Sequence, residues 1–118
     1  MRIGIFSKKQ LSDITGIDPR TITRMKTEPD YTPSLVYIVA CCVAMGLLPW
    51  ECDTLLYLAG YTLRLGNKVE RAYTTIIHIF AVECTLEQCD EILNQMGIDK
   101  LSDIIKKNKK EKTKKEKN

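Results

Sequence analysis

The feature that most restricts the fold of this chain is a glycine between two short helix-forming segments, in residues 7–26 (SKKQLSDITGIDPRTITRMK). Gly16 can adopt the positive φ that ends a helix, because it has no side chain to resist it. Asp18 is a favourable N-cap, and Pro19 suits the first position of the next helix. Ser7 is a suitable cap for the first helix. The sequence therefore predicts two helices joined by a tight turn.

Apolar residues are spaced so that these two helices can pack together. Leu11 lies on the first helix, and Ile17 follows the glycine, where it can fill the corner. Ile22 and Met25 are three residues apart and therefore share one face of the second helix. This arrangement is that of a helix-turn-helix, whose second helix enters the major groove of DNA.

The remaining face of the second helix carries side chains that can read bases. Arg20 and Arg24 are four residues apart and rise from one face, with Thr23 beside them. An arginine can donate two hydrogen bonds to guanine, and a threonine can contact a base edge or a thymine methyl group. We therefore expect these three residues to contact bases.

Other polar residues of the two helices suit the DNA backbone. Lys8 and Lys9 stand at the start of the first helix, where positive charge opposes the helix dipole, so a bound phosphate explains them better than helix stability does. Lys26 ends the second helix, and Thr21 lies near its start. We expect Lys8, Lys9, Thr21 and Lys26 to hold phosphates.

Residues 7–26 resemble the helix-turn-helix of the Cro/C1-type (XRE) regulators of bacteria and phages. Gly16 falls on the turn glycine of that family, and Pro19, Arg20 and Arg24 fall on its main base-reading positions. Residues 32–61 (TPSLVYIVACCVAMGLLPWECDTLLYLAGY) resemble the next two helices of such domains. The resemblance implies a lambda-repressor-like fold, regulation of transcription, and binding of double-stranded DNA as a homodimer.

The chain departs from this family at two places. The family has a full helix before the motif, whereas residues 1–6 (MRIGIF) are too short for a stable helix and suit an extended arm. We therefore expect either that the domain has lost its first helix or that this sequence is a piece of a longer chain, and another element must cover the core. Ile14 stands where a solvated polar residue is usual, which predicts a contact with another part of the chain or with a second subunit.

Caps and apolar spacing predict further helices after the motif and no strand, so the expected class is all-α. Asn67 is a suitable N-cap, and Thr85 with Gln88 forms a capping box. An apolar side is expected on the helix after Pro49, made by Leu55, Leu56, Leu58 and Ala59. The expected helices run from Thr32–Pro33 to about Ala44, from Pro49 to Gly60, from Lys68 to about Ala81, from Leu86 to Met96 and, as a short turn, from Leu101 to Ile105.

These patterns predict three segments. Residues 1–63 form the DNA-binding domain, residues 64–105 a C-terminal helical extension, and residues 106–118 a lysine-rich tail that is expected to be disordered. Three roles are open to the extension: it can complete the core, form a dimer interface, or receive a protein partner on its acidic surface. The acids expected on that solvated surface are Glu83, Glu87, Asp90 and Glu91.

The net charge of +3 is unevenly distributed along the chain. Residues 1–26 hold six bases and two acids, whereas residues 72–105 hold six acids and one lysine. An acidic body is repelled by phosphate, so DNA should meet the motif end. A second basic patch is expected at Arg64, Lys68 and Arg71 if these side chains face the same side.

The residues give little support for catalysis or for a cofactor. His78 is the only histidine and lies among apolar residues, and the five cysteines form no Cys-x-x-Cys pair, so no zinc site, other metal site or catalytic residue is expected. Reduced core cysteines suggest a cytoplasmic protein. The apolar run at residues 35–48 is too short to cross a bilayer, and no secretory signal opens the chain.

The sequence therefore predicts a DNA-binding transcriptional regulator without enzymatic activity. The alternative is a module of helix-turn-helix shape that binds another protein and not DNA; the missing helix, the acidic body and Ile14 favour it. A weaker third hypothesis is a switch that responds to a ligand or to thiol oxidation. Its candidate thiols are Cys84 and Cys89, which are expected to be the less buried ones.

Overall fold

The computed structural model describes residues 8–28 and 30–108. These residues contain helices and no strand, so the predicted all-α class is confirmed. A last helix covers residues 101–108. Before it the elements are, in order, α1 (Lys8–Thr15), α2 (Pro19–Thr27), α3 (Leu35–Ala44), α4 (Pro49–Leu58), α5 (Lys68–Thr75), the π-helix η2 (Ile76–Phe80) and α6 (Leu86–Gln95).

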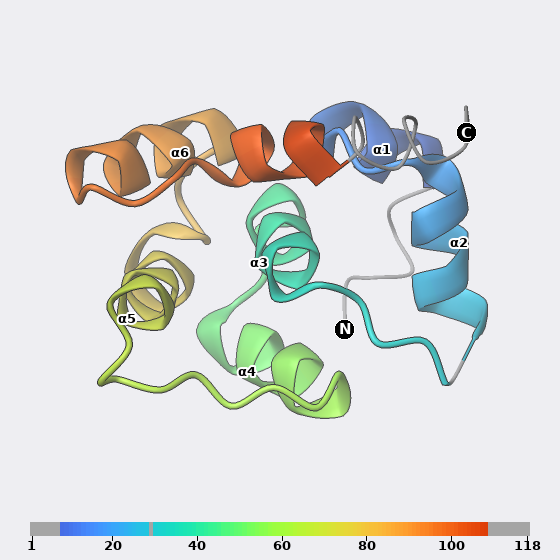
Figure 1. Ribbon diagram of the computed structural model, residues 1–118, viewed down its shortest axis with the longest axis horizontal. Coiled ribbons are helices and arrows are strands. Elements are labelled where there is room, and N and C mark those ends of the chain that lie inside the picture. The colour runs from blue at the N-terminus through green and yellow to red at the C-terminus, as the bar shows by residue number, and fades with distance from the viewer. Residues whose placement is uncertain (1–7, 29, 109–118) are drawn as a thin grey trace.

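The helices surround α3, which lies in the middle of the molecule (Figure 1). Along one side run α6, the helix at residues 101–108 and α1, and along the other side runs α4. Helices α2 and α5 lie at opposite ends of the longest axis, which measures 40 Å. None of the helices in the described residues has the length and apolar character needed to cross a membrane.

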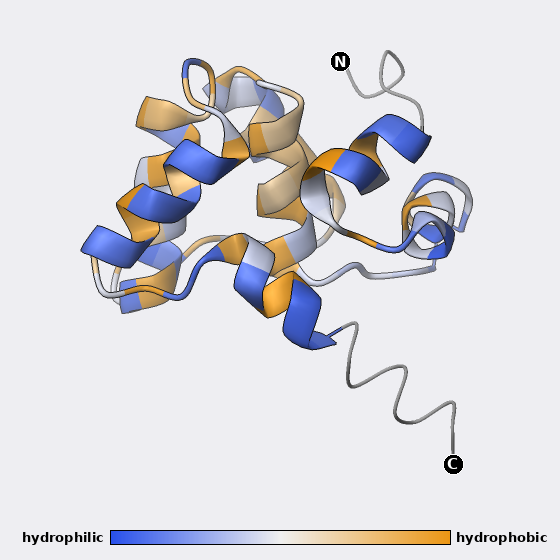
Figure 2. Ribbon diagram, turned by 90° about the horizontal axis from the view of Figure 1, so that it is seen from above, coloured by the Kyte–Doolittle hydropathy of each residue, from blue (hydrophilic) through white to orange (hydrophobic). Residues whose placement is uncertain are grey.

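One cluster of buried side chains holds these helices together. Every residue of α3 from Ile38 to Val43 is buried. Figure 2 shows apolar residues concentrated on the central helices, while hydrophilic and apolar residues alternate along the outer helices. The cluster draws on residues from both predicted segments, among them Leu11, Ile22, Leu56, Tyr73, Ile76, Leu93 and Leu101.

The predicted corner between α1 and α2 is confirmed in its local geometry. Gly16 has a φ of +80°, and its amide donates to the Ser12 carbonyl oxygen at 2.8 Å. The Asp18 carboxylate accepts from the Arg20 amide at 2.8 Å and caps α2. Ile17 is buried in the corner, as its place after the glycine predicts. The direction in which α2 leaves α1 is therefore fixed by short-range contacts.

The helix at residues 101–108 closes the core beside this corner. Leu101 and Ile105 are buried, and the Ile105 Cγ2 atom lies 3.9 Å from where a Cβ on Gly16 would stand. Asp90 caps the helix from α6, because its carboxylate accepts from the Leu101 amide at 2.8 Å and from the Ser102 hydroxyl at 2.6 Å. The expectation that Asp90 is solvated is wrong, because this cap needs a carboxylate inside the fold.

The structure corrects four other local expectations. Helix α3 begins at Leu35 and not at Thr32–Pro33, because Ser34 has an extended backbone and is the N-cap, and the Pro33 carbonyl accepts from the Tyr61 hydroxyl at 2.7 Å. The helix expected over residues 68–81 changes to a π-helix after Thr75, where the Ala81 amide donates to the Ile76 carbonyl oxygen at 2.9 Å. Leu58 is exposed, because it lies on the outer side of α4.

The fourth correction concerns the last helix, which continues past Ile105 to residue 108 and takes in the first residues of the predicted tail. The Asn67 cap and the Thr85–Gln88 capping box are confirmed. Three further expectations, the Ser7 cap, the extended arm at residues 1–6 and the disorder of residues 109–118, lie outside the described residues.

Replacing Gly16 with alanine should lower the free energy of unfolding by about 1–2 kcal/mol, because an L side chain resists a φ of +80°. Gly66→Ala is the matched control, since Gly66 has no positive φ and a Cβ there meets nothing within 4 Å. Urea unfolding followed by circular dichroism measures both variants. Equal losses in the two would contradict the strained corner.

Replacing Asp90 with alanine should lower the free energy of unfolding by about 1–3 kcal/mol, since it leaves a helix start without its cap. Glu91→Ala removes an exposed carboxylate from the next position of α6 and should change the unfolding free energy by less than about 0.5 kcal/mol. The same urea titration measures the free energy of unfolding of both variants. The cap would be disproved if both variants were as stable as the native protein.

Candidate nucleic-acid interface

Helix α2 is the most weakly enclosed part of the corner. It packs chiefly against α1 and lies at one end of the longest axis (Figure 1). Thr21 and Ile22 are its buried residues, and the rest of its side chains are partly or fully exposed. The outward face of α2 is therefore open to solvent.

Arg20 projects from the first turn of α2, and its side chain is 72% exposed. Its guanidinium donates to both carboxylate oxygens of Asp18, at 3.3 Å from Nε and 3.2 Å from Nη2. The same carboxylate caps the helix through the Arg20 amide. Asp18 therefore holds Arg20 close to the start of α2 while leaving the guanidinium open to solvent.

Arg24 lies one turn further along and is 49% exposed. Its Nε donates to the Glu28 carboxylate at 3.0 Å. Its guanidinium also lies over the Tyr31 ring, 4.2 Å from the ring centroid. The stacked ring and the carboxylate therefore hold the Arg24 side chain in this position beside the C-terminal end of α2.

Both arginines thus have carboxylate partners from their own chain. Ion pairs between exposed side chains contribute about 0–1 kcal/mol and are screened by salt. A bidentate contact to guanine discriminates against the wrong base by about 1–3 kcal/mol. The exchange of Asp18 and Glu28 for a base edge is therefore within the reach of ordinary binding energies, and both guanidinium groups have the exposure it needs.

The other predicted contact residues differ in how accessible they are. Pro19 occupies the first position of α2 and is exposed, and Thr23 is partly exposed, with its hydroxyl donating to the Pro19 carbonyl oxygen at 3.1 Å. Lys9 and Lys26 are exposed. Thr21 is only 6% exposed, so its hydroxyl is covered and we omit it from the proposed phosphate contacts.

Lys8 begins α1, but its side chain lies outside the part that the structure describes. Sequence reasoning missed Glu28 and Tyr31 as partners of Arg24. The spacing of four residues between Arg24 and Glu28 could have revealed the ion pair. No sequence pattern predicts the stacking on Tyr31, because it depends on how the chain leaves α2.

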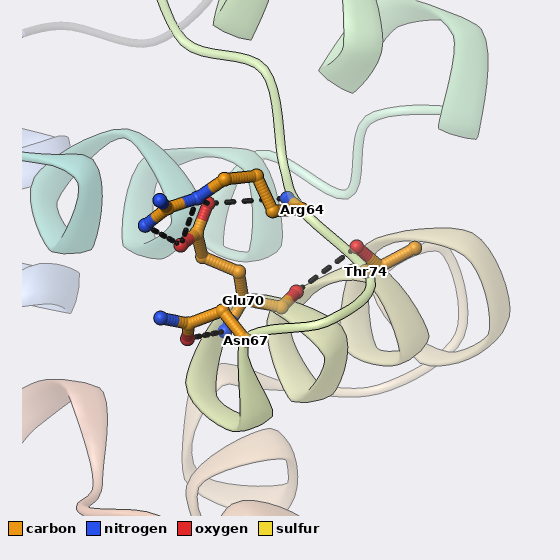
Figure 3. Close-up of polar contacts among 4 residues, drawn as sticks. All are labelled: Arg64, Asn67, Glu70 and Thr74. Atoms are coloured by element: carbon orange, nitrogen blue, oxygen red, sulfur yellow. Dashed lines mark hydrogen bonds and ion pairs between the residues drawn. The ribbon is translucent and has the colours of Figure 1, made fainter.

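Two of the three residues of the expected second basic patch, Arg64 and Arg71, contact groups of their own chain. Figure 3 shows the Arg64 guanidinium held by Glu70, with 2.7 Å between Nη2 and Oε2. This pair raises the pKa of Arg64 and lowers that of Glu70. Arg71 donates to the Leu65 carbonyl oxygen at 2.9 Å. These contacts of Arg64 and Arg71 therefore hold the loop before α5 against the first turns of that helix.

An apolar groove of about 550 Å³ lies between α2 and the pair α3 and α4. Its walls include Ile22 and Met25 from α2, Ile38 and Met45 from the α3 side, and Leu55 from α4. Ile14 borders a different and more polar hollow, next to α6 and the helix at residues 101–108. Ile14 thus has neighbours from the same chain in this hollow, while 47% of its surface stays exposed.

The cysteines are chiefly core residues. Cys41, Cys42, Cys52 and Cys89 are buried, Cys84 is partly exposed, and all five are free thiols. Burial raises the pKa of Cys41 and of Cys89 to about 12. A hydrogen bond to Cys52 and burial both raise the pKa of Cys42. The expectation that Cys89 is one of the less buried thiols is wrong, because it faces the core from α6.

In the folded protein iodoacetamide should therefore modify Cys84 first and leave Cys41 and Cys89 unmodified. Their pKa values of about 12 lie above the ordinary 9.0, so they stay protonated when a thiol of the unfolded chain ionises. Because these pKa values are raised on folding, the two protonated thiols stabilise the folded state fully below about pH 9, and this stabilisation is lost as the pH rises towards about 12. Peptide mass spectrometry after timed alkylation checks the order, and equal rates for Cys84 and Cys89 would contradict it.

In the described residues no three His, Cys, Asp or Glu side chains are grouped as metal ligands would be. His78 instead contacts Asp53 at 3.0 Å on the surface. Comparison of the chain with protein-family models, with curated proteins and with solved structures found no match. The candidate site is therefore defined by its own geometry: a capped helix at the end of the molecule with two oriented, exposed arginines.

Proposed function

We propose that this protein is a sequence-specific DNA-binding regulator of transcription, with α2 as its recognition helix. The observation that carries the proposal is the pair Arg20 and Arg24 on the outward face of a helix whose direction is fixed by the Gly16 turn. Arg20 and Arg24 read base edges, Thr23 and Pro19 adjoin them, and Lys8, Lys9 and Lys26 contact phosphates.

The resemblance of residues 7–26 and 32–61 to Cro/C1-type (XRE) regulators supports the same function. A lambda-repressor-like arrangement fits the order of α1 to α4, with the extension contributing to the core. The proposal includes a homodimer on two half-sites, a bacterial or phage cytoplasm, and no enzymatic activity. The net charge of residues 1–26, with six bases and two acids, suits a negatively charged partner.

Replacing Arg24 with alanine should reduce the preference for the best site over random DNA by about 1–3 kcal/mol, because a bidentate base contact is lost. Lys9→Ala should weaken both DNAs equally and reduce the slope of log K against log salt by about 1. The best site is first selected from a random library, and fluorescence anisotropy at several salt concentrations then measures each affinity.

Arg64→Ala is the matched control, since it removes the same charge from an exposed arginine that is bound to Glu70. It should change neither the preference nor the salt slope. If Arg24→Ala and Lys9→Ala reduced specific and random binding by the same factor, the division into base and phosphate contacts would be wrong. Loss of affinity in Arg64→Ala alone would move the interface away from α2.

A second candidate function is supported by the carboxylates that face both arginines and by the apolar groove beside α2. In this alternative the corner binds a protein, and its arginines hold the local structure together. A gel-shift experiment on genomic fragments at low and high salt separates the two functions. DNA binding that weakens with salt supports the regulator, and no binding at low salt supports the protein-interaction module.

A further inference from the structure

The largest aromatic side chains left exposed in the described part of the chain lie on one face of α4. Trp50 is 61% exposed and Tyr57 is 78% exposed, and seven residues separate them, so they project from the same side of the helix. Asp53 lies between them on that side. Its carboxylate contacts the His78 ring at 3.0 Å, which joins this face of α4 to the outer face of η2.

The outer face of η2 continues the apolar surface. Ile79 follows His78 and is 63% exposed, and Val82 is 46% exposed just after the π-helix. Helix α4 packs directly against η2, and the contact between Asp53 and His78 joins the exposed sides of the two elements. We define the α4–η2 patch as Trp50, Asp53, Tyr57, His78, Ile79 and Val82.

From this surface we infer that the α4–η2 patch is the interface through which two copies of this chain form a dimer. The inference deepens the proposed function and rests on it for its biological meaning, since a helix-turn-helix regulator reads two half-sites as a symmetric pair. The interface adds the residues that would hold that pair together.

The exposed area of the patch agrees with what a dimer needs. A fully exposed large side chain presents about 150–250 Å², so the four apolar members together offer about 500 Å² on each copy. Two copies face to face bury about 1,000 Å² before the polar rim is counted, which reaches the lower limit of specific interfaces. The affinity of such an interface is set by how closely its aromatic side chains pack and not by its area, so it has to be measured.

The charges of the patch favour a second copy as its occupant. The patch holds one carboxylate, Asp53, which contacts His78 of the same chain, so two patches facing each other bring only two carboxylates together. In a twofold arrangement each contact that one copy makes is repeated by the other, as an isologous interface requires. The exposed face of α6 carries the carboxylates Glu87 and Glu91, and two such faces would repel each other.

The position of the patch is compatible with binding two half-sites. The patch lies on α4 and η2, whereas the arginines lie on α2 at one end of a molecule 40 Å long. A contact through the body thus leaves both recognition helices uncovered. Half-sites on DNA are about 34 Å apart. A twofold axis through the body has to lie about half that distance from each α2, and the length of the molecule allows it.

The test is sedimentation velocity over a range of protein concentrations, with three variants beside the native chain. Native protein should change from the 13.5 kDa monomer to twice that mass as its concentration rises. Tyr57→Glu and Ile79→Glu should raise the concentration of half-dissociation about tenfold or more. Met96→Glu introduces the same charge at an exposed methionine next to the end of α6, outside the patch, and should leave self-association unchanged.

Trp50 gives a second and local readout, because it is the only tryptophan of the chain. Its fluorescence emission should move to shorter wavelength as the dimer forms, since the indole leaves water. The shift should follow the sedimentation curve in native protein and in Met96→Glu, and should disappear in Tyr57→Glu and Ile79→Glu at the same concentrations. Circular dichroism confirms that all four proteins are folded.

The outcomes separate this inference from the proposed function. A chain that stays monomeric at every concentration, both free and on DNA, overturns the interface while leaving DNA binding intact. Self-association that the patch variants do not weaken, or that Met96→Glu weakens equally, also overturns it. A dimer that the patch variants dissociate but that binds no DNA at low salt supports the interface and overturns the proposed function.

Discussion

A helix without a polar side determines the rest of this structure. In α3 every residue from Ile38 to Val43 is buried, so there is no face that can be left to water. Such a helix is stable only when other elements cover it on all sides. Helices α1, α4, α6 and η2 do so, and the helix at residues 101–108 closes the gap beside the α1–α2 corner. The C-terminal extension is therefore part of the core.

The same constraint explains why α2 is available for binding. Its partner α1 is held against α3, and α2 follows from α1 through a turn whose geometry is fixed by Gly16 and the Asp18 cap. Few contacts reach α2 from the rest of the molecule, so its outward side chains stay exposed. The arginines are positioned by local contacts to Asp18, Glu28 and Tyr31, and not by the core. A rigid base with exposed side chains suits recognition of a large, charged partner.

The extension combines two kinds of surface. Its inner side supplies Leu93, Leu101 and Ile105 to the core, and Asp90 ties α6 to the last helix with two hydrogen bonds. Its outer side differs between elements: α6 is acidic, whereas η2 with α4 is apolar and aromatic. The π-helix contributes to this difference, because it buries Ile76 and Ile77 while leaving His78 and Ile79 outside. One segment can thus complete the fold and also offer a surface to a second copy.

The sequence by itself determined the local elements of this protein. Helix ends and helix faces depend on interactions within a few residues, so they can be recognised in the sequence. Examples are the positive φ of Gly16 and the caps at Asp18, Asn67 and Thr85. Only the tertiary structure decided which side chains those elements bring together. Asp90 looked solvent-accessible and is buried, because it caps a helix that follows later in the chain, and Cys89 is buried in the core. The stacking of Arg24 on Tyr31 and the contact of His78 with Asp53 likewise arise between segments whose approach no local pattern encodes.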